Sequence, residues 1–175
     1  MKPARITRGG TYYRVCDPSW TDPADTSYAK RKGGRWNPPG EFGALYLSES
    51  IVVAAANARR SLQLEFGDAV TFADLRPERR PDVQAFTVKN HRFVDAVSAK
   101  GIAALGLPVT YPESCGHRLC QSIARTLYRA NEAGIAVRSA AADGEELAIF
   151  DSHQALARRS RKGRRSFHEW FPGIA

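Results

Sequence analysis

The pattern of apolar and polar positions predicts short strands followed by a long helix in the first third of the chain. Residues 11–16 are rich in aromatic and β-branched side chains, which is typical of a strand, and residues 44–48 form a second short apolar run. The apolar run that begins at Ile51 is too long to alternate with polar residues. Ser50 suits a helix N-cap and Gly67 a helix C-cap, so this segment predicts a helix.

A second helix is predicted where Leu119, Ile123, Leu127 and Ala130 recur at helical spacing, and Gly134 ends that pattern. Shorter patterns predict strands at 69–75, 135–137 and 147–150, and a helix at 92–104. Strands toward both ends with helices between them favour an α+β fold over a regular βαβ array, and 175 residues suffice for one domain.

The positive charge of the chain is concentrated near its C-terminus. Six of the 26 Lys and Arg residues lie within residues 158–165, and without these six the net charge falls from +8 to +2. Such a run is typical of a solvated or disordered segment that can contact RNA or an acidic partner. We therefore predict a domain over residues 1–155 and a basic tail over residues 156–175.

The remaining composition predicts a cytoplasmic protein without a metal. No run of 18 apolar residues occurs, and no apolar signal-peptide stretch is visible near Met1. Three cysteines are a poor disulfide framework. Cys115, His117 and Cys120 suggest zinc by their proximity, but a structural zinc site needs four ligands, and no second pair of ligands accompanies them.

Two arginines and several aromatic residues are the candidates for binding a nucleotide. Arg14 lies in a predicted strand, Arg35 lies on the Gly- and Pro-rich stretch 33–40, and two arginines can grip a diphosphate bidentately. Four aromatic side chains could stack on a flat ring: Tyr12, Tyr13, Trp36 and Tyr46. The alternative is that Arg14 pairs with a carboxylate and the aromatic residues form the core. The sequence has no Rossmann, P-loop or Gly-x-Ser-x-Gly motif.

Several segments together resemble the RES-domain family, the toxins of RES–Xre toxin–antitoxin modules. They are Tyr-Arg-Val at 13–15, Gly-Gly-Arg-Trp-Asn-Pro-Pro at 33–39, Ala-Leu-Tyr-Leu-Ser at 44–48, Cys-Gln-Ser-Ile at 120–123 and Gly-Ile-Ala-Val-Arg-Ser-Ala at 134–140. The similarity extends over residues 11–150. It implies a compact α+β fold of the ADP-ribosyltransferase (diphtheria-toxin-like) type with a central cleft.

The resemblance also implies what the protein does. NAD⁺ is the implied substrate, and ADP-ribose is transferred to a protein acceptor; the alternative is an NAD⁺ glycohydrolase or phosphorylase, with water or phosphate as acceptor. The implied partner is an Xre-like antitoxin, which would provide the only link to nucleic acid, and no membrane contact is expected. A catalytically weak member that binds only nucleotide, and an RNA-binding protein that uses the basic tail, remain further alternatives.

The resemblance assigns roles to particular residues and reveals one departure. Arg14 and Arg35 match family arginines, Tyr46 matches a tyrosine that packs on nicotinamide, and Ser139 matches the family serine. The family glutamate would lie on the helix after residues 44–48, at a position that holds Asn57 in this chain.

The loss of that glutamate matters because a carboxylate stabilises the positive charge that develops when the nicotinamide–ribose bond breaks. Four carboxylates could substitute for it: Glu49, which is nearest in sequence, Glu65, Glu145 and Glu146. Otherwise hydrolysis is weakened so that transfer to a protein acceptor dominates, which is the interpretation we favour, or the substitution is inactivating. In the remaining alternative Asn57 only caps or packs.

Overall fold

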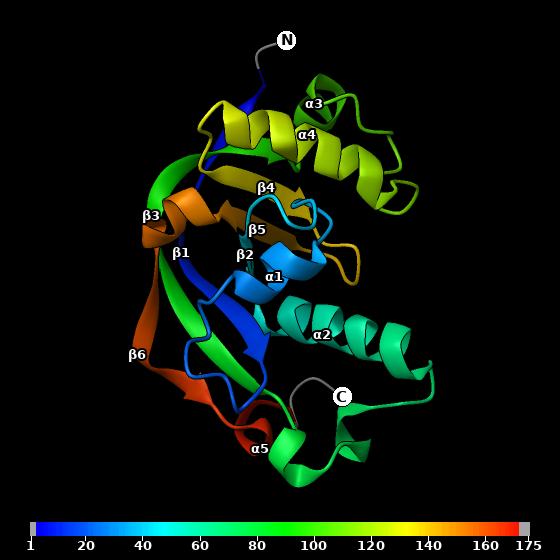
Figure 1. Cartoon of the computed structure of the whole chain (residues 1–175), viewed down its shortest axis with the longest axis vertical. Coiled ribbons are helices and arrows are strands. Elements are labelled where there is room, and N and C mark those ends of the chain that lie inside the picture. The colour runs from blue at the N-terminus through cyan, green and yellow to red at the C-terminus, as the bar shows by residue number, and fades with distance from the viewer. Residues whose placement is uncertain (1–2, 172–175) are drawn as a thin grey trace.

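The computed structural model describes residues 3–171 of the chain, apart from the side chain of Lys162, and its centre is a six-stranded sheet (Figure 1). The strands are β1 (Arg5–Cys16), β2 (Ala44–Ser48), β3 (Asp82–Ala96), β4 (Gly134–Arg138), β5 (Glu145–Phe150) and β6 (Ala157–Arg165). Their order is β1-β2-β5-β4-β3-β6, and an additional pairing of β1 with β3 closes the first five strands into a ring. Of these pairings, only β3 with β4 is parallel.

The helices connect the strands and cover the sheet. They are α1 (Ser27–Lys32), α2 (Ile51–Phe66), α3 (Ala99–Ala104), α4 (His117–Arg129) and α5 (Phe167–Trp170), with 3₁₀ turns at Phe72–Asp74, Pro77–Arg79 and Asp151–Leu156. The parallel strands β3 and β4 need a crossover connection, which α3 and α4 provide at one end of the molecule (Figure 1). The predicted α+β class is confirmed. Within residues 3–171, no helix is both long and apolar enough to cross a bilayer.

Alternation along the central strands divides the apolar side chains between two cores. Leu45 and Leu47 of β2 belong to one core with Leu147 of β5, whereas Ala44 and Ala148 belong to the other. Successive side chains of a strand point to opposite faces, so each strand contributes to both cores. The second core is covered by α4, and it leads into the functional site described below.

The helix predicted after Ser50 is confirmed, whereas two other local predictions are wrong. The Ser50 side chain accepts a hydrogen bond from the Val53 backbone N–H at 3.2 Å, and α2 ends before Gly67. The strand predicted at 69–75 is instead a capped 3₁₀ turn, because Asp74 accepts hydrogen bonds from both the backbone and the hydroxyl of Thr71. The helix predicted at 92–104 begins only at Ala99, because residues 92–96 complete β3 and pair with β1 or β4.

The basic run at 158–165 is predicted to be a solvated or disordered tail, and this prediction is wrong. The run forms strand β6. Its backbone pairs with β3, with Ala157 opposite Val88 and Arg159 opposite Phe86, while most of its arginine side chains remain exposed. The predicted boundary at residue 155 falls within the 3₁₀ turn that leads into this strand. Residues 172–175 of the predicted tail lie outside the described residues. Backbone hydrogen bonds to β3 therefore hold this segment in the sheet, although its charged side chains predict an exposed tail.

Candidate functional site

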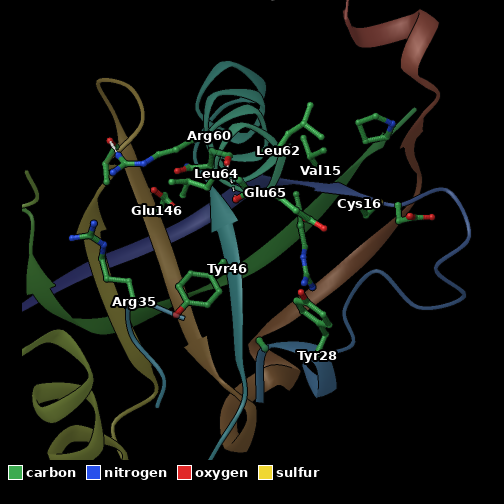
Figure 2. A pocket seen from close by; sticks show the side chains of 18 of the residues that line it. Val15, Cys16, Tyr28, Arg35, Tyr46, Arg60, Leu62, Leu64, Glu65 and Glu146 are labelled. Atoms are coloured by element: carbon green, nitrogen blue, oxygen red, sulfur yellow. Dashed lines mark hydrogen bonds between the residues drawn. The ribbon is translucent and has the colours of Figure 1, made fainter. Parts of the chain in front are cut away.

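A cleft of about 620 Å³ opens between α2 and the strands and contains most of the predicted site residues. This volume lies within the range of roughly 300–1,000 Å³ that is usual for small-molecule sites. Figure 2 shows Arg35, Tyr46 and Glu146 around the same space, with Arg60 and Leu64 projecting from α2. Arg14, Arg35, Tyr46 and Asn57 line the cleft, and Ser139 contacts Asn57 at its edge.

Arg14 projects from β1 and is held by the backbone of the following loop. Its Nη1 donates to the carbonyl oxygens of Pro23 at 2.7 Å and Asp25 at 3.3 Å, and its Cζ lies 5.0 Å from the ring centroid of Trp20. Burial lowers the pKa of the guanidinium, since the charged form loses hydration. Within residues 3–171 Arg14 forms no salt bridge, so the alternative in which a carboxylate pairs with it is wrong.

Arg35 lies on the predicted Gly- and Pro-rich loop and reaches the cleft from the side of α4. Its Nη1 donates to the carbonyl oxygens of Pro112 and Cys115, each at 3.1 Å. Gln121 of α4 holds the same loop by donating from Nε2 to the Gly34 carbonyl at 2.8 Å. Among the described residues Arg35, like Arg14, has no carboxylate within salt-bridge distance.

Tyr46 connects strand β2 to the loop that carries Arg35. Its hydroxyl accepts from the backbone N–H of Trp36 at 2.8 Å and donates to Oδ1 of Asn37 at 2.9 Å. Burial raises the pKa of this hydroxyl, so it stays protonated at neutral pH. A Cβ atom at Gly34 would lie only 2.6 Å from the Tyr46 hydroxyl, so the contact requires glycine there. The ring of Tyr46 lines the cleft.

Asn57 and Ser139 come from α2 and from the end of β4 and meet at the edge of the cleft. Asn57 donates from Nδ2 to Ser139 Oγ at 3.2 Å and to the Val53 carbonyl at 3.1 Å. Ser139 Oγ also accepts from the backbone N–H of Ala141 at 3.2 Å. Both Nδ2 protons are therefore used, while Asn57 Oδ1 can accept and the Ser139 hydroxyl can donate.

Glu146 lies in the cleft beside these residues, although the sequence offered it only as one of four candidate carboxylates, of which Glu49 was the nearest in sequence. It is opposite Ser48 of β2 and Val137 of β4, and it lines the cleft with Tyr46 (Figure 2). Burial raises the pKa of its carboxyl group, while the polar side chains of Ser139 and Asn57 and the charge of Arg35 oppose this shift. A carboxylate therefore faces Asn57, from a strand far away in sequence.

Only some of the predicted aromatic residues reach the cleft. Tyr12 is part of a core cluster away from it. Trp36 lines the cleft beside Arg35, but it is only 1% exposed and packs edge-on against Tyr111. Trp20 and Tyr28 do line the cleft, but their loop and short helix gave no signal in the sequence. Tyr28 is 59% exposed, so it forms part of the rim.

The cysteines are buried, and the residues suspected of binding zinc do not form a site. Cys115 Sγ lies 3.3 Å from Cys120 Sγ within the core. Over the described part of the chain, no group of three His, Cys, Asp or Glu side chains could hold a metal. His117 instead lines the cleft, where burial and the nearby Arg35 and Arg60 lower the pKa of its imidazole.

Comparisons with known proteins show a family and a solved structure with a similar fold. The family model described as the RES domain matches residues 11–172. A solved structure described as the MbcT-MbcA toxin-antitoxin complex of M. tuberculosis has a similar fold, with a TM-score of 0.80 and 21% identity over 97% of this chain and 91% of that chain. A search of curated proteins gives no match.

Proposed function

The chain belongs to the RES domain family, and from this premise we propose that it is the toxin of a toxin–antitoxin pair and consumes NAD⁺ in the cleft. The family resemblance names NAD⁺ as the substrate, and we propose an ADP-ribosyltransferase-like arrangement of the cleft. The fold shared with the toxin–antitoxin complex of M. tuberculosis supports an antitoxin as the partner. We take this partner to be Xre-like, as the resemblance implies.

The observation that carries the proposal is the pair of arginines without acidic partners. Arg14 and Arg35 line one cleft from different elements, and neither forms a salt bridge within residues 3–171. A half-buried charge without a partner is costly, and a bound anion removes that cost. The diphosphate of NAD⁺ offers two negative charges and oxygen atoms that suit guanidinium groups.

The other side of the cleft suits the nicotinamide riboside half. Tyr46 presents an aromatic ring whose hydroxyl is already fixed by Trp36 and Asn37, so the ring is held in place before a ligand arrives. Asn57 Oδ1 can accept from a ribose hydroxyl group, and the Ser139 hydroxyl, which also neighbours Glu146, can donate to one. The residues that bind the diphosphate and those that orient the scissile bond thus lie on different elements.

We propose a protein as the acceptor of ADP-ribose, because exposed apolar side chains surround the mouth of the cleft. Tyr28 and Leu64 both line it and are 59% and 81% exposed, which is typical of a surface that binds another protein. A second candidate is hydrolysis or phosphorolysis of NAD⁺. The carboxylate of Glu146 favours this second reaction, since a carboxylate can activate a small nucleophile.

The test uses the purified full-length protein and NAD⁺ labelled in its adenylate half, in phosphate buffer with cell lysate. Label in a protein band supports transfer, and label only in small molecules supports hydrolysis or phosphorolysis. Intact NAD⁺ would contradict the proposed function. The matched control is Arg125→Gln, which removes an exposed arginine of α4 that pairs with Glu41 outside the cleft.

A further inference from the structure

The alternation of side chains along β5 places the carboxyl group of Glu146 on the face of the sheet that borders the cleft. On β5, Leu147 and Ile149 face one core, so Glu146 and Ala148 face the other, with Ala148 opposite Tyr46. Val137 of β4 lies opposite Glu146 and belongs to that second core. A charged side chain thus stands where the face of an apolar core meets the cleft, a position that would cost stability without a function.

Each of the three other carboxylates proposed to replace the family glutamate is paired, outside the cleft or exposed at its rim. Glu145 accepts from Arg8 Nε at 2.6 Å and from Nη2 at 2.8 Å. Glu49 is exposed and does not line the cleft, and Glu65 is exposed on the last turn of α2 at the rim. Glu146 has no salt bridge within the described residues, and its neighbours are Asn57 and Ser139.

We propose that Glu146 is the catalytic carboxylate of this chain, and that it acts from β5 in place of the glutamate that the family carries at the position of Asn57. This inference rests on the proposed function, NAD⁺ cleavage in the cleft. Asn57 then orients Ser139 and the ribose through its amide. Two residues thus share the roles of one glutamate: Glu146 on β5 supplies the negative charge, and Asn57 on α2 supplies the hydrogen bonds.

The reaction that follows is a substitution at C1′ of the nicotinamide ribose. The bond from C1′ to the nicotinamide nitrogen breaks, its electron pair stays on that nitrogen, and neutral nicotinamide leaves. The Glu146 carboxylate stabilises the positive charge that develops at C1′. A lone pair of the acceptor forms the new bond to C1′, and the acceptor proton passes to the carboxylate and then to solvent.

The surrounding charges set the pH behaviour of this step. Burial disfavours the ionised form of the carboxyl group, whereas the side chains of Ser139 and Asn57 and the charge of Arg35 favour it. The other cationic or titratable side chains that line the same cleft are Arg60, Arg138 and His117. Tyr46 faces it from β2 as a neutral phenol, because its own pKa is raised. The rate should therefore fall on acidification as Glu146 takes up a proton, with its midpoint above the ordinary pKa of glutamate.

The experiment compares Glu146→Gln with the matched control Glu145→Gln, using full-length protein, NAD⁺ turnover as a function of pH and the affinity for ADP-ribose. We expect E146Q to lose about 10²–10³-fold in kcat, with unchanged affinity for ADP-ribose and without the acid limb of the pH profile. The control E145Q should keep the wild-type kcat and the acid limb of the pH profile. Turnover by E146Q at the wild-type rate overturns the inference and leaves the proposed function intact, whereas an inactive wild-type protein contradicts the proposed function itself.

An exchange of the two residues tests whether they reach the same carbon atom. Glu146→Asn alone should be as slow as E146Q, and adding Asn57→Glu should recover part of the loss, because the carboxylate returns from the opposite side. Circular dichroism confirms that both variants are folded. A folded double variant that remains as slow as E146N would contradict the proposed exchange of roles.

Discussion

Tyr46 donates its phenolic proton to Oδ1 of Asn37, 2.9 Å away, and so ties strand β2 to the loop that carries Arg35. The same hydroxyl accepts from the Trp36 N–H, so one oxygen atom satisfies two buried groups. This contact fixes the position of Arg35 relative to the aromatic ring that we assign to nicotinamide. The geometry of the cleft therefore depends on a hydroxyl that need not touch the substrate.

The substitution Tyr46→Phe should separate these two roles. It keeps the ring but leaves Oδ1 of Asn37 and the backbone N–H of Trp36 without their partner, so the free energy of unfolding should fall by about 1–3 kcal/mol. Urea unfolding measures this change. The matched control is Tyr28→Phe at the exposed rim, where we expect no loss of stability. Equal stability of Y46F and wild type would show that the hydroxyl is dispensable.

Removing either cleft arginine should weaken the binding of the diphosphate. Arg14→Gln and Arg35→Gln each remove charge-assisted hydrogen bonds, and we expect the affinity for NAD⁺ or ADP-ribose to fall by about 10–100-fold. Isothermal titration calorimetry provides the measurement, and Arg125→Gln provides a control whose affinity should equal that of wild type. Undiminished affinity in both cleft variants would exclude the diphosphate site.

The titration of Glu146 predicts that stability depends on pH with a definite sign. Burial raises the pKa of its carboxyl group in the folded state, so the group stabilises the fold while protonated, and this contribution is lost as the pH rises through that raised pKa. The glutamine side chain in the Glu146→Gln variant does not titrate. We therefore expect a higher Tm than wild type at about pH 8 and no difference at about pH 4. An E146Q protein that is less stable at the higher pH would contradict this sign.

The C-terminal segment that consists of β6 and α5 should be needed for folding rather than for turnover. Trp170, just beyond it, packs on Phe72 and donates from Nε1 to the Pro81 carbonyl at 3.0 Å, so Trp170→Ala should destabilise the fold by about 3–5 kcal/mol. The exposed pair Arg158→Gln and Arg161→Gln removes charge alone and should leave both stability and NAD⁺ turnover unchanged. Urea unfolding and turnover of the two proteins check this. A loss of turnover in the charge variant, with stability preserved, would make the basic surface part of the function.

The three cysteines should react slowly with thiol reagents in the folded protein. All three are buried, and burial raises the pKa of Cys16 to about 11 and that of Cys120 to about 12, so little thiolate forms at neutral pH. We expect Ellman's reagent to modify three thiols quickly in urea and none quickly in buffer. Rapid modification of a native thiol would show that the packing around it opens.

Local signals in the sequence were sufficient for some elements and misleading for others. The helix α2 was predictable because its N-cap at Ser50 and its end before Gly67 are decided within a few residues. The basic segment was not, because its solvent-facing arginines dominate the local pattern, whereas its backbone is satisfied by β3, more than 60 residues earlier in the chain. Residues 92–96 were predicted to be helical for a similar reason, because part of this segment pairs with β1, which is also far away in the sequence.

The site was predictable only as far as the family resemblance reaches. Arg14, Arg35, Tyr46 and Asn57 could be named from matched segments, and the structure brings them around one cleft. Glu146 could not be separated from Glu145 beside it, because the choice depends on which face of β5 points to the cleft. That face is set by the register of β5 against β2 and β4 and not by any local pattern.

The closed ring of strands has a consequence for the newly made chain. Arg14 lies on β1, whereas Glu146 lies on β5, which is held between β2 and β4 and is made after β1, β2, β3 and β4. Contacts between such distant segments form late in folding. A product that stops before β5 would therefore carry the arginines without the carboxylate, and the cleft is complete only after β5 has been made.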